Sequence, residues 1–328
     1  MRQNRFGKLS FSVGDVGFGA WQIGGNWGDV SEADGRAALN AALDAGMTFI
    51  DTADVYGDGR SEKIIAEVLK ARGGTRPMVA TKAGRRLNPH TADGYNKANL
   101  EAFIDRSLMN LGVDSLDLVQ LHCPPVETLY RPELFAALDD IKASGKIKGY
   151  GVSVEKVEEA LKAVEFPGVV SIQIIYNLFR QRPAELFFKE ARRRHVAVIA
   201  RVPLASGLLS GKISRDTKFV ADDHRNFNRH GEAFDVGETF SGVPIEIGFE
   251  AVKALRKLVP QGASLAQFAL RWILMNDAVT VVIPGARNAE QARANAAASD
   301  LAPLSAETMA AAREIYDRLI APRVHQRW

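Results

Sequence analysis

About eight short apolar segments recur along the chain, and stretches with helical periodicity separate them. Most of these segments are apolar at successive positions, which is typical of parallel strands covered on both faces. Strands of this kind that alternate with amphipathic helices predict repeated βαβ units around one parallel sheet. The expected strands are Val16–Ala20, Met47–Asp51, Met78–Lys82, Leu116–His122, Ile147–Ser153, Val169–Ile175, Val196–Val202 and Val279–Pro284.

This pattern predicts an α/β fold, a single (β/α)8 TIM barrel that spans residues 1–328 as one domain. A length of 328 residues also fits two ordinary domains. However, no linker or shift in composition divides the chain, and a barrel reaches this size with insertions. We expect three additions: a short N-terminal β extension at Lys8–Val13, a long polar loop after the seventh strand between Leu208 and Pro244, and a C-terminal helix near Ala306–Leu319.

Single residues suggest where some of the helices begin and end. Ser31 and Ser61 each precede a helical pattern and are candidate N-caps. Gly112 follows the apolar stripe that ends at Leu111, which suggests a C-cap.

The composition narrows the class of protein. Hydrophobic residues make up 46% of the chain, enough for a large core, and the formal net charge is +3. A charge this balanced predicts no nucleic-acid partner. No apolar run approaches a membrane span, no signal peptide is recognisable, and Cys123 is the only cysteine. We therefore expect a cytoplasmic protein without a membrane partner, and the oligomeric state stays open.

Polar residues end three consecutive expected strands. Asp51, Lys82 and His122 occupy these positions, and Tyr56 follows Asp51 in the next loop. The C-terminal strand ends of a (β/α)8 barrel share one rim, where the chemistry of such barrels takes place. The four side chains are therefore expected to meet, although each of them alone could have a structural role.

Together the four residues suit proton delivery by a phenol. An ammonium about 4 Å from Tyr56 would favour the phenolate by roughly 4 kcal/mol at an effective dielectric of 20, or about three pKa units. Lys82 could therefore bring Tyr56 towards the working range of a general acid. Asp51 would hold Lys82, and His122 would hydrogen-bond the substrate oxygen.

Several motifs make the chain resemble the aldo-keto reductase superfamily over nearly its whole length. These motifs are DTADVYGDGRSE at 51–62, TK at 81–82, DLVQLH at 117–122, GVS at 151–153, QIIYN at 173–177, PLASGLLSGK at 203–212 and IPGARNAEQ at 283–291. The resemblance implies a (β/α)8 barrel that uses NADPH, less often NADH, to reduce aldehydes and ketones or to run the reverse oxidation. It also implies that Asp51, Tyr56, Lys82 and His122 form the catalytic tetrad, with Tyr56 as the proton donor.

The resemblance also implies a cofactor site. Ser153 and Gln173 would hold the nicotinamide carboxamide, with Tyr176 near the ring, and Gly207 to Lys212 would cover the pyrophosphate. Arg287, at the start of the last barrel helix, would bind the 2′-phosphate and favour NADPH over NADH. The full set of expected cofactor contacts is Trp21, Ser153, Gln173, Tyr176, Arg201, Pro203, Leu204, Ser206, Gly207, Leu209, Lys212, Gly285, Arg287, Gln291 and Asn295.

Other positions have open or modest interpretations. Trp21 and Trp27 are expected to wall the substrate pocket. Arg201 and Ala294 depart from the family pattern, and Arg201 could either bind phosphate or pair internally. His224 and its neighbours in the long loop suggest solvated polarity and no metal site. Cys123 is expected to pack on the opposite face of its strand from His122.

Two other functions compete with a carbonyl reductase. Potassium-channel beta subunits resemble the same family and would bind the cofactor as regulatory partners. A metal-dependent hydrolase could use Asp51 and His122, but no His-x-His pair or carboxylate cluster supports it. The substrate also stays open among small aldehydes, 2-oxo-aldehydes and sugars, the last with a sugar dehydrogenase as the physiological direction.

Overall fold

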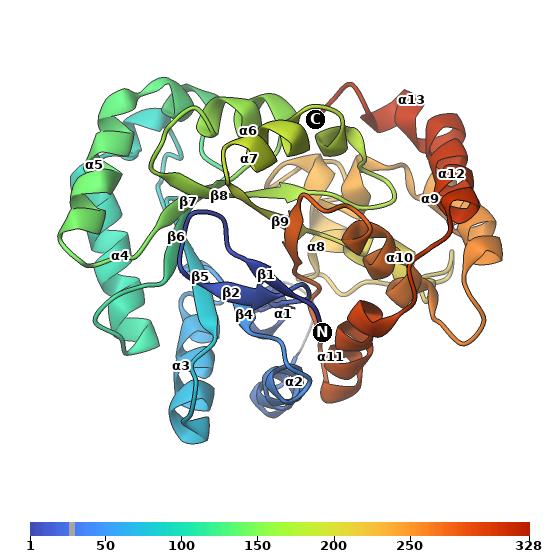
Figure 1. The fold of residues 1–328 in the computed structure, drawn as a ribbon, viewed down its shortest axis with the longest axis horizontal. Coiled ribbons are helices and arrows are strands. Elements are labelled where there is room, and N and C mark those ends of the chain that lie inside the picture. The colour runs from blue at the N-terminus through green and yellow to red at the C-terminus, as the bar shows by residue number, and fades with distance from the viewer. Residues whose placement is uncertain (26–29) are drawn as a thin grey trace.

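The computed structural model describes residues 1–25 and 30–328, and in this part of the chain eight parallel strands form one sheet. The strands follow one another in chain order around the sheet (Figure 1). They are β3 (Phe18–Gly19), β4 (Phe49–Asp51), β5 (Met78–Ala83), β6 (Leu118–His122), β7 (Tyr150–Ser153), β8 (Val169–Ile175), β9 (Ala197–Arg201) and β10 (Val279–Val282).

The sheet closes on itself between its first and last strands. Parallel bridges join Val16 to Val282 and Gly19 to Gly285. The backbone nitrogen of Gly19 donates to the oxygen of Pro284 at 3.0 Å. The predicted (β/α)8 barrel is therefore confirmed, and all eight strands direct their C-terminal ends to one rim.

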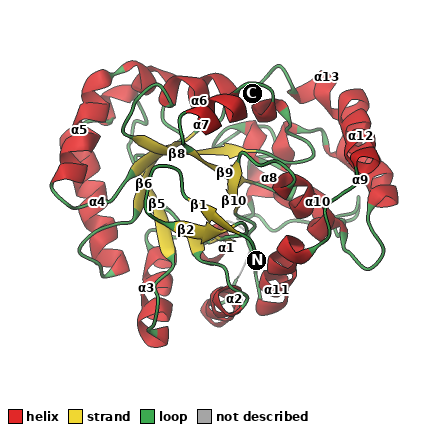
Figure 2. Cartoon of the chain, in the orientation of Figure 1, coloured by secondary structure: helices red, strands yellow, loops and turns green. Residues whose placement is uncertain are grey.

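Helices surround the sheet, as the alternating pattern predicts (Figure 2). They are α1 (Trp21–Gly24), α2 (Glu32–Asp44), α3 (Arg60–Arg72), α4 (Lys97–Leu111), α5 (Pro132–Ala143), α6 (Val157–Ala163), α7 (Phe187–Arg193), α8 (His224–Phe227), α9 (Ile245–Leu255), α10 (Leu265–Leu274), α11 (Ala289–Ala296), α12 (Ala306–Ile315) and α13 (Ala321–Val324). Ser31 caps α2 and Gly112 ends α4, as expected. The prediction for Ser61 is wrong, because α3 begins at Arg60 and Ser61 already lies inside its first turn.

A β-hairpin covers the N-terminal end of the barrel (Figure 1). Its strands β1 (Gln3–Arg5) and β2 (Ser12–Gly14) pair antiparallel, and Phe6 stacks on Phe49 inside the barrel at 5.4 Å between ring centroids. The expected N-terminal β extension is present, although β1 precedes the predicted Lys8–Val13 segment. Because the hairpin covers this end, the opposite rim is the open one.

The long segment after β9 folds over that rim as a series of short helical turns. These turns are η4 (Ala205–Ser210), α8, η5 (Val236–Glu238) and η6 (Phe240–Gly242). The indole nitrogen of Trp328, the last residue, donates to the Asp235 carboxylate at 2.9 Å and so fastens this segment to the C-terminal helices.

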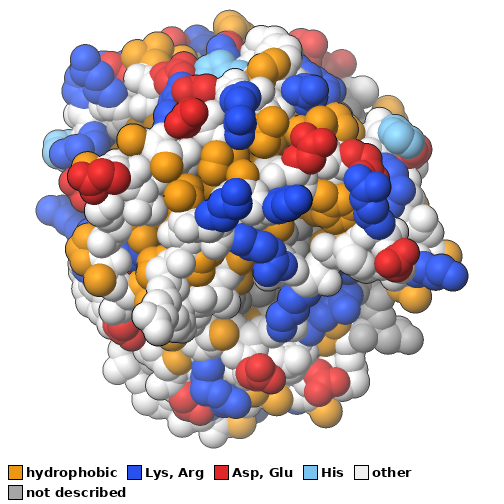
Figure 3. Space-filling view, turned by 90° about the vertical axis from the view of Figure 1, so that its right-hand side faces the viewer, with side chains coloured by type: hydrophobic (Ala, Val, Ile, Leu, Met, Phe, Trp, Pro, Cys, Tyr) orange, Lys and Arg blue, Asp and Glu red, His pale blue; other side chains and the backbone are white. Residues whose placement is uncertain are grey.

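The surface carries charges of both signs. In the view of Figure 3, lysine and arginine side chains gather towards the middle of the face, while acidic side chains are spread around them. No helix in the described part of the chain combines the length and apolar character needed to cross a membrane.

Candidate active site

Three side chains from two neighbouring strand ends meet inside the rim. The Lys82 ammonium donates to Asp51 Oδ2 at 2.6 Å and to the Thr52 carbonyl at 2.8 Å. The same nitrogen lies 3.3 Å from the Tyr56 hydroxyl. Only 1% of the Lys82 side chain is exposed, so the Asp51 carboxylate is the counter-charge that lets the ammonium stay buried.

The pKa of Tyr56 is shifted in the opposite direction to the expected one. Burial raises the pKa of Tyr56 above its usual value, and the nearby Lys82 ammonium lowers it by less than burial raises it. The predicted shift towards neutrality is therefore wrong, because the cost of burying the phenolate outweighs the attraction of the ammonium. Tyr56 stays a protonated phenol at neutral pH, which is the form that a proton donor needs.

His122 ends β6 and faces Tyr56. The two rings meet edge to face with centroids 6.0 Å apart. Burial lowers the pKa of His122 well below its usual value, and the Arg85 and Lys82 cations lower it further. The imidazole is therefore neutral, and its Nδ1 atom has no hydrogen-bond partner among the described residues.

Gln173 and Ser153 lie next to this cluster. They occupy paired positions on β8 and β7, and their side-chain oxygens are 3.4 Å apart. The Gln173 amide donates to Asp51 Oδ1 at 2.7 Å, and the Gln120 amide donates to the same oxygen at 3.2 Å. The sequence analysis missed Gln120, although it lies two residues before His122 and therefore on the same face of β6.

Trp21 lies over the phenol. Its ring stacks on Tyr56, with centroids 6.0 Å apart, and contacts His224 at 4.9 Å and Phe234 at 6.1 Å. Trp27, the other expected wall of the pocket, lies outside the described residues. The expectation of solvated polarity is wrong for His224, which is fully buried because it packs on Trp21, whereas Arg229 and His230 are exposed.

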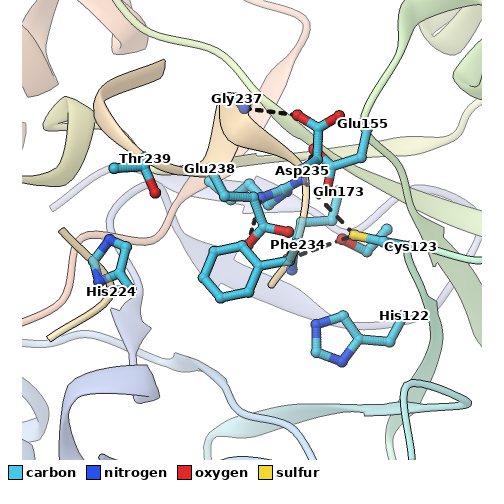
Figure 4. Close-up of polar contacts among 12 residues, drawn as sticks. His122, Cys123, Glu155, Gln173, His224, Phe234, Asp235, Gly237, Glu238 and Thr239 are labelled. Atoms are coloured by element: carbon cyan, nitrogen blue, oxygen red, sulfur yellow. Dashed lines mark hydrogen bonds and ion pairs between the residues drawn. The ribbon is translucent and has the colours of Figure 1, made fainter. Parts of the chain in front are cut away.

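The loop after β9 also contributes a buried carboxylate that the sequence analysis missed. Glu238 accepts from Arg85 Nη2 at 2.8 Å, and Arg201 lies 3.7 Å away. Burial alone would raise the pKa of Glu238, but these two arginines hold it well below its usual range. Figure 4 shows Glu238 and Phe234 of this loop between His224 on one side and His122 and Cys123 on the other.

Arg201 pairs internally with carboxylates, which is one of the two roles considered for it. Its guanidinium donates to Glu155 Oε2 at 2.7 Å and to the Val154 carbonyl at 3.2 Å, and 8% of the side chain is exposed. Burial raises the pKa of Glu155 to about 8. Because these carboxylates hold the guanidinium, the structure shows internal pairing for Arg201, and its expected contact with the cofactor stays a prediction.

Two further expectations need correction. Tyr176 does not point to the rim but packs in the helical layer, with ring centroids 4.8 Å from Phe188 and 5.1 Å from Trp272.

Cys123 does not pack on the outer face of β6. Its backbone has a φ of 47°, and its sulfur turns towards Ser153 at 3.6 Å. Burial raises the pKa of the Cys123 thiol, which leaves it a poor nucleophile.

A second group of side chains forms a cradle beyond Trp21. Asp223 binds Arg225 at 2.5 Å and lies 3.9 Å from Arg287. Arg225 Nη1 reaches the Ser206 carbonyl at 3.5 Å, next to Gly207, whose φ is +98°. This arrangement places two guanidinium groups beside a glycine turn, a donor set suited to phosphate groups.

Helix α11 completes that cradle. Asn288 caps its first turn by accepting from the Gln291 backbone at 2.9 Å. Gln291 Oε1 accepts from the Arg287 backbone at 2.9 Å, and the Asn295 amide donates to the Gly285 carbonyl at 3.1 Å. Gln291 and Asn295 therefore brace the turn before α11, while Arg287 leaves 39% of its side chain exposed.

The remaining expected cofactor contacts belong to the turn after β9. Pro203 and Leu204 lead into it, Ser206 and Gly207 lie within it, and Lys212 is exposed after it. Leu209 is fully buried in the hydrophobic core, so only its main chain is available to a ligand. The turn thus offers backbone amides with one exposed cation, and it borders the cradle through Ser206.

The model of the aldo/keto reductase family matches residues 15–317. The chain belongs to this family. It is 31% identical over 288 residues to aldo-keto reductase YhdN of Bacillus subtilis, covering 85% of this chain and 83% of that protein. It is also 28% identical to a probable voltage-gated potassium channel subunit beta of Arabidopsis thaliana, with 93% of each chain covered.

A solved structure of another family member supports the same barrel. An aldo/keto reductase from Klebsiella pneumoniae, in complex with NADP and acetate, superposes with a TM-score of 0.70 at 25% identity, covering 96% of this chain and 95% of that one. Membership in the aldo/keto reductase family makes this chain an oxidoreductase by family.

Proposed function

We propose that this aldo/keto reductase family member reduces aldehydes or ketones to alcohols with NADPH, and that Tyr56 donates the proton. The observation that carries the proposal is the Lys82 ammonium, which lies 3.3 Å from the Tyr56 hydroxyl and 2.6 Å from Asp51. As negative charge develops on the substrate oxygen, the Tyr56 hydroxyl transfers its proton to that oxygen. Lys82 stabilises the phenolate that remains.

The other residues of the site act on Tyr56 or on the substrate oxygen. Asp51 fixes the position of Lys82, and the neutral His122 ring lies edge to face with Tyr56, beside the proposed position of the substrate oxygen. Trp21 and Phe234 cover the site and exclude water, which strengthens these electrostatic interactions.

The donors present fit a nicotinamide dinucleotide. Ser153 and Gln173 offer the hydroxyl and amide groups that a carboxamide needs, and the cradle of Arg225, Arg287 and the α11 N-terminus offers donors to phosphate. When bound there, the cofactor supplies a hydride. The guanidinium group of Arg287 beside α11 supports NADPH in preference to NADH.

The possible metal ligands in the described part of the chain give less support to metal chemistry than the Tyr56 site gives to carbonyl reduction. Among the described residues, Cys123, Glu155 and Glu238 come close enough to share an ion. However, Arg201 pairs with both carboxyl groups and Arg85 with one of them, so guanidinium groups already occupy this cluster.

A cofactor titration followed by a substrate screen tests this proposal. Purified protein should bind NADPH more tightly than NADH and should consume NADPH with aldehydes, or reduce NADP+ with sugars if oxidation is the physiological direction. Cofactor binding without turnover of any carbonyl or sugar would instead favour a regulatory role, which the plant channel-subunit relative makes the second candidate.

A further inference from the structure

Five side chains, including the Tyr56 phenol, form a closed ring of contacts. Trp21 and His122 each lie 6.0 Å from Tyr56 between ring centroids, and Phe234 lies 6.1 Å from Trp21. Arg85 closes the ring, because its guanidinium lies 5.7 Å from the Phe234 centroid and its Nη1 lies 3.5 Å from His122 Nε2. A substrate oxygen placed between Tyr56 and His122 therefore lies within this ring.

Arg85 is the polar member of the ring that the proposed proton transfer does not use. It follows β5 three residues after Lys82, and 25% of its side chain is exposed. A guanidinium has five N–H donors in a rigid fork. The hydrogen bonds described for Arg85 are those to Glu238 and His122, so the fork has N–H groups left for a ligand.

Arg85 is paired with a buried carboxylate, which it shares with Arg201 at 3.7 Å. Glu238 holds Nη2 at 2.8 Å, and only 5% of the Glu238 side chain is exposed. A second anion brought to this guanidinium would meet the Glu238 carboxylate at close range. A neutral oxygen would gain a hydrogen bond from a charged donor without that repulsion.

We propose that Arg85 is a specificity-determining residue that recognises a neutral second oxygen, a hydroxyl or oxo group, on the carbon next to the substrate carbonyl. This inference rests on the proposed function. While the carbonyl oxygen lies at Tyr56 and His122, the adjacent oxygen lies within reach of the fork, because Arg85 Nη1 is 3.5 Å from His122 Nε2. The four aromatic side chains of the ring contact the apolar part of the substrate.

The test compares 2-hydroxypropanal with 2-methylpropanal, in which a methyl group replaces the hydroxyl. The ratio of their kcat/KM values is measured with NADPH for the wild type and for Arg85→Met. Because the same two aldehydes are used in both proteins, differences in aldehyde hydration cancel. Loss of one hydrogen bond from a charged donor should lower the ratio by roughly 10- to 100-fold.

Arg86→Met is the matched control. Arg86 is the next residue in the chain, but its guanidinium pairs at the surface with Asp58, 2.5 Å away. This variant should keep the wild-type ratio. An Arg85→Met protein that lowers kcat/KM for both aldehydes equally would show that Arg85 only tethers the loop, and the inference would be overturned.

Glyoxylate, which carries a carboxylate beside its aldehyde, tests the preference for a neutral oxygen. The wild type should prefer 2-hydroxypropanal, and Glu238→Gln should raise kcat/KM for glyoxylate relative to 2-hydroxypropanal by at least about tenfold. A wild-type preference for glyoxylate would overturn the inference. If 2-methylpropanal is reduced through Tyr56 but Arg85 does not affect the ratio, only this inference fails; if no aldehyde is reduced, the proposed function fails with it.

Discussion

The Lys82 ammonium lies 3.3 Å from the Tyr56 hydroxyl; the Lys82 side chain is fully buried and Tyr56 is half-buried. Burial raises the pKa of Tyr56 and the ammonium lowers it, so the phenol keeps its proton at neutral pH. The ammonium next to the phenol then favours the charge that remains once the proton has left. Tyr56 therefore carries its proton before the reaction, and the Lys82 ammonium stabilises the phenolate after the proton has left.

Asp51 should be essential for both stability and turnover. Its carboxylate, 5% exposed, accepts from Lys82 at 2.6 Å and from Gln173 at 2.7 Å. Asp51→Asn leaves the buried ammonium without a counter-charge, so the free energy of unfolding should fall by about 3–5 kcal/mol. Turnover should fall with it.

Asp44→Asn is the matched control for that experiment. Asp44 pairs with Arg72 at 2.6 Å, but 66% of its side chain is exposed. The loss in denaturant unfolding should therefore stay below about 1 kcal/mol. Equal losses in the two variants would contradict the role given to Asp51.

The burial of the Asp54 carboxyl group predicts an unusual dependence of the free energy of unfolding on pH. It is fully buried, and its carboxylate oxygens have no hydrogen-bond partner among the described residues. Burial and the nearby Glu62 raise the pKa of Asp54 from 3.8 to about 7, although Arg86 and Arg106 partly offset this. The folded state therefore binds more protons than the unfolded state between about pH 4 and 7, and stability falls as the pH rises through that window.

Asp54→Asn should remove this slope. Urea unfolding at pH 8 should show the variant more stable than the wild type by roughly 1–4 kcal/mol, with a smaller difference near pH 4. A wild-type stability that rises between pH 4 and 7, and rises equally in the variant, would show that Asp54 is not the titrating group.

The pH dependence of reduction follows from His122 and Tyr56. Because the pKa of His122 is lowered and that of Tyr56 is raised, neither group changes charge between about pH 6.5 and 10. His122 and Tyr56 should therefore add no inflection to kcat/KM for reduction over that range. An inflection near pH 7 that disappears in His122→Asn would contradict the neutral assignment.

Arg287 should determine the choice of cofactor. It lies before α11 with 39% of its side chain exposed, next to Asp223. Arg287→Ala should weaken NADPH binding about tenfold and leave NADH binding within about threefold, because NADH lacks the 2′-phosphate. Arg293→Ala, which changes an exposed residue of the same helix, should leave fluorescence titrations with both cofactors unchanged.

The barrel and the meeting of Tyr56 with Asp51, Lys82 and His122 could be predicted because their signals are local. Apolar runs indicate buried parallel strands, and a polar residue that ends each run indicates the rim. The role of Ser31 could be predicted for the same reason, since an N-cap bonds only to its own first turn. The role of Ser61 could not, because its hydroxyl bonds to Thr52 at 2.8 Å and to the Ala20 carbonyl at 3.1 Å instead of capping α3.

The covering of the site could not be predicted, because it depends on pairings across the chain. Glu238 is 153 residues from Arg85, and nothing near either residue indicates the other. Ser206 and Phe240 have left-handed backbone conformations, with φ values of 53° and 52°. Neither residue is a glycine, so the sequence does not indicate this conformation. Tyr176 shows a similar limit, because strand periodicity ends at Ile175 and no longer fixes where the next side chain points.

Tyr56→Phe tests the central claim most directly, since it removes one hydroxyl and keeps the ring that stacks on Trp21. The measurement pairs NADPH titration with the single-turnover rate of reduction of an aldehyde that the wild type accepts. We predict NADPH affinity within about threefold of the wild type and a rate lower by about 10²- to 10⁴-fold. A rate within a few-fold of the wild type would show that the proton comes from another group.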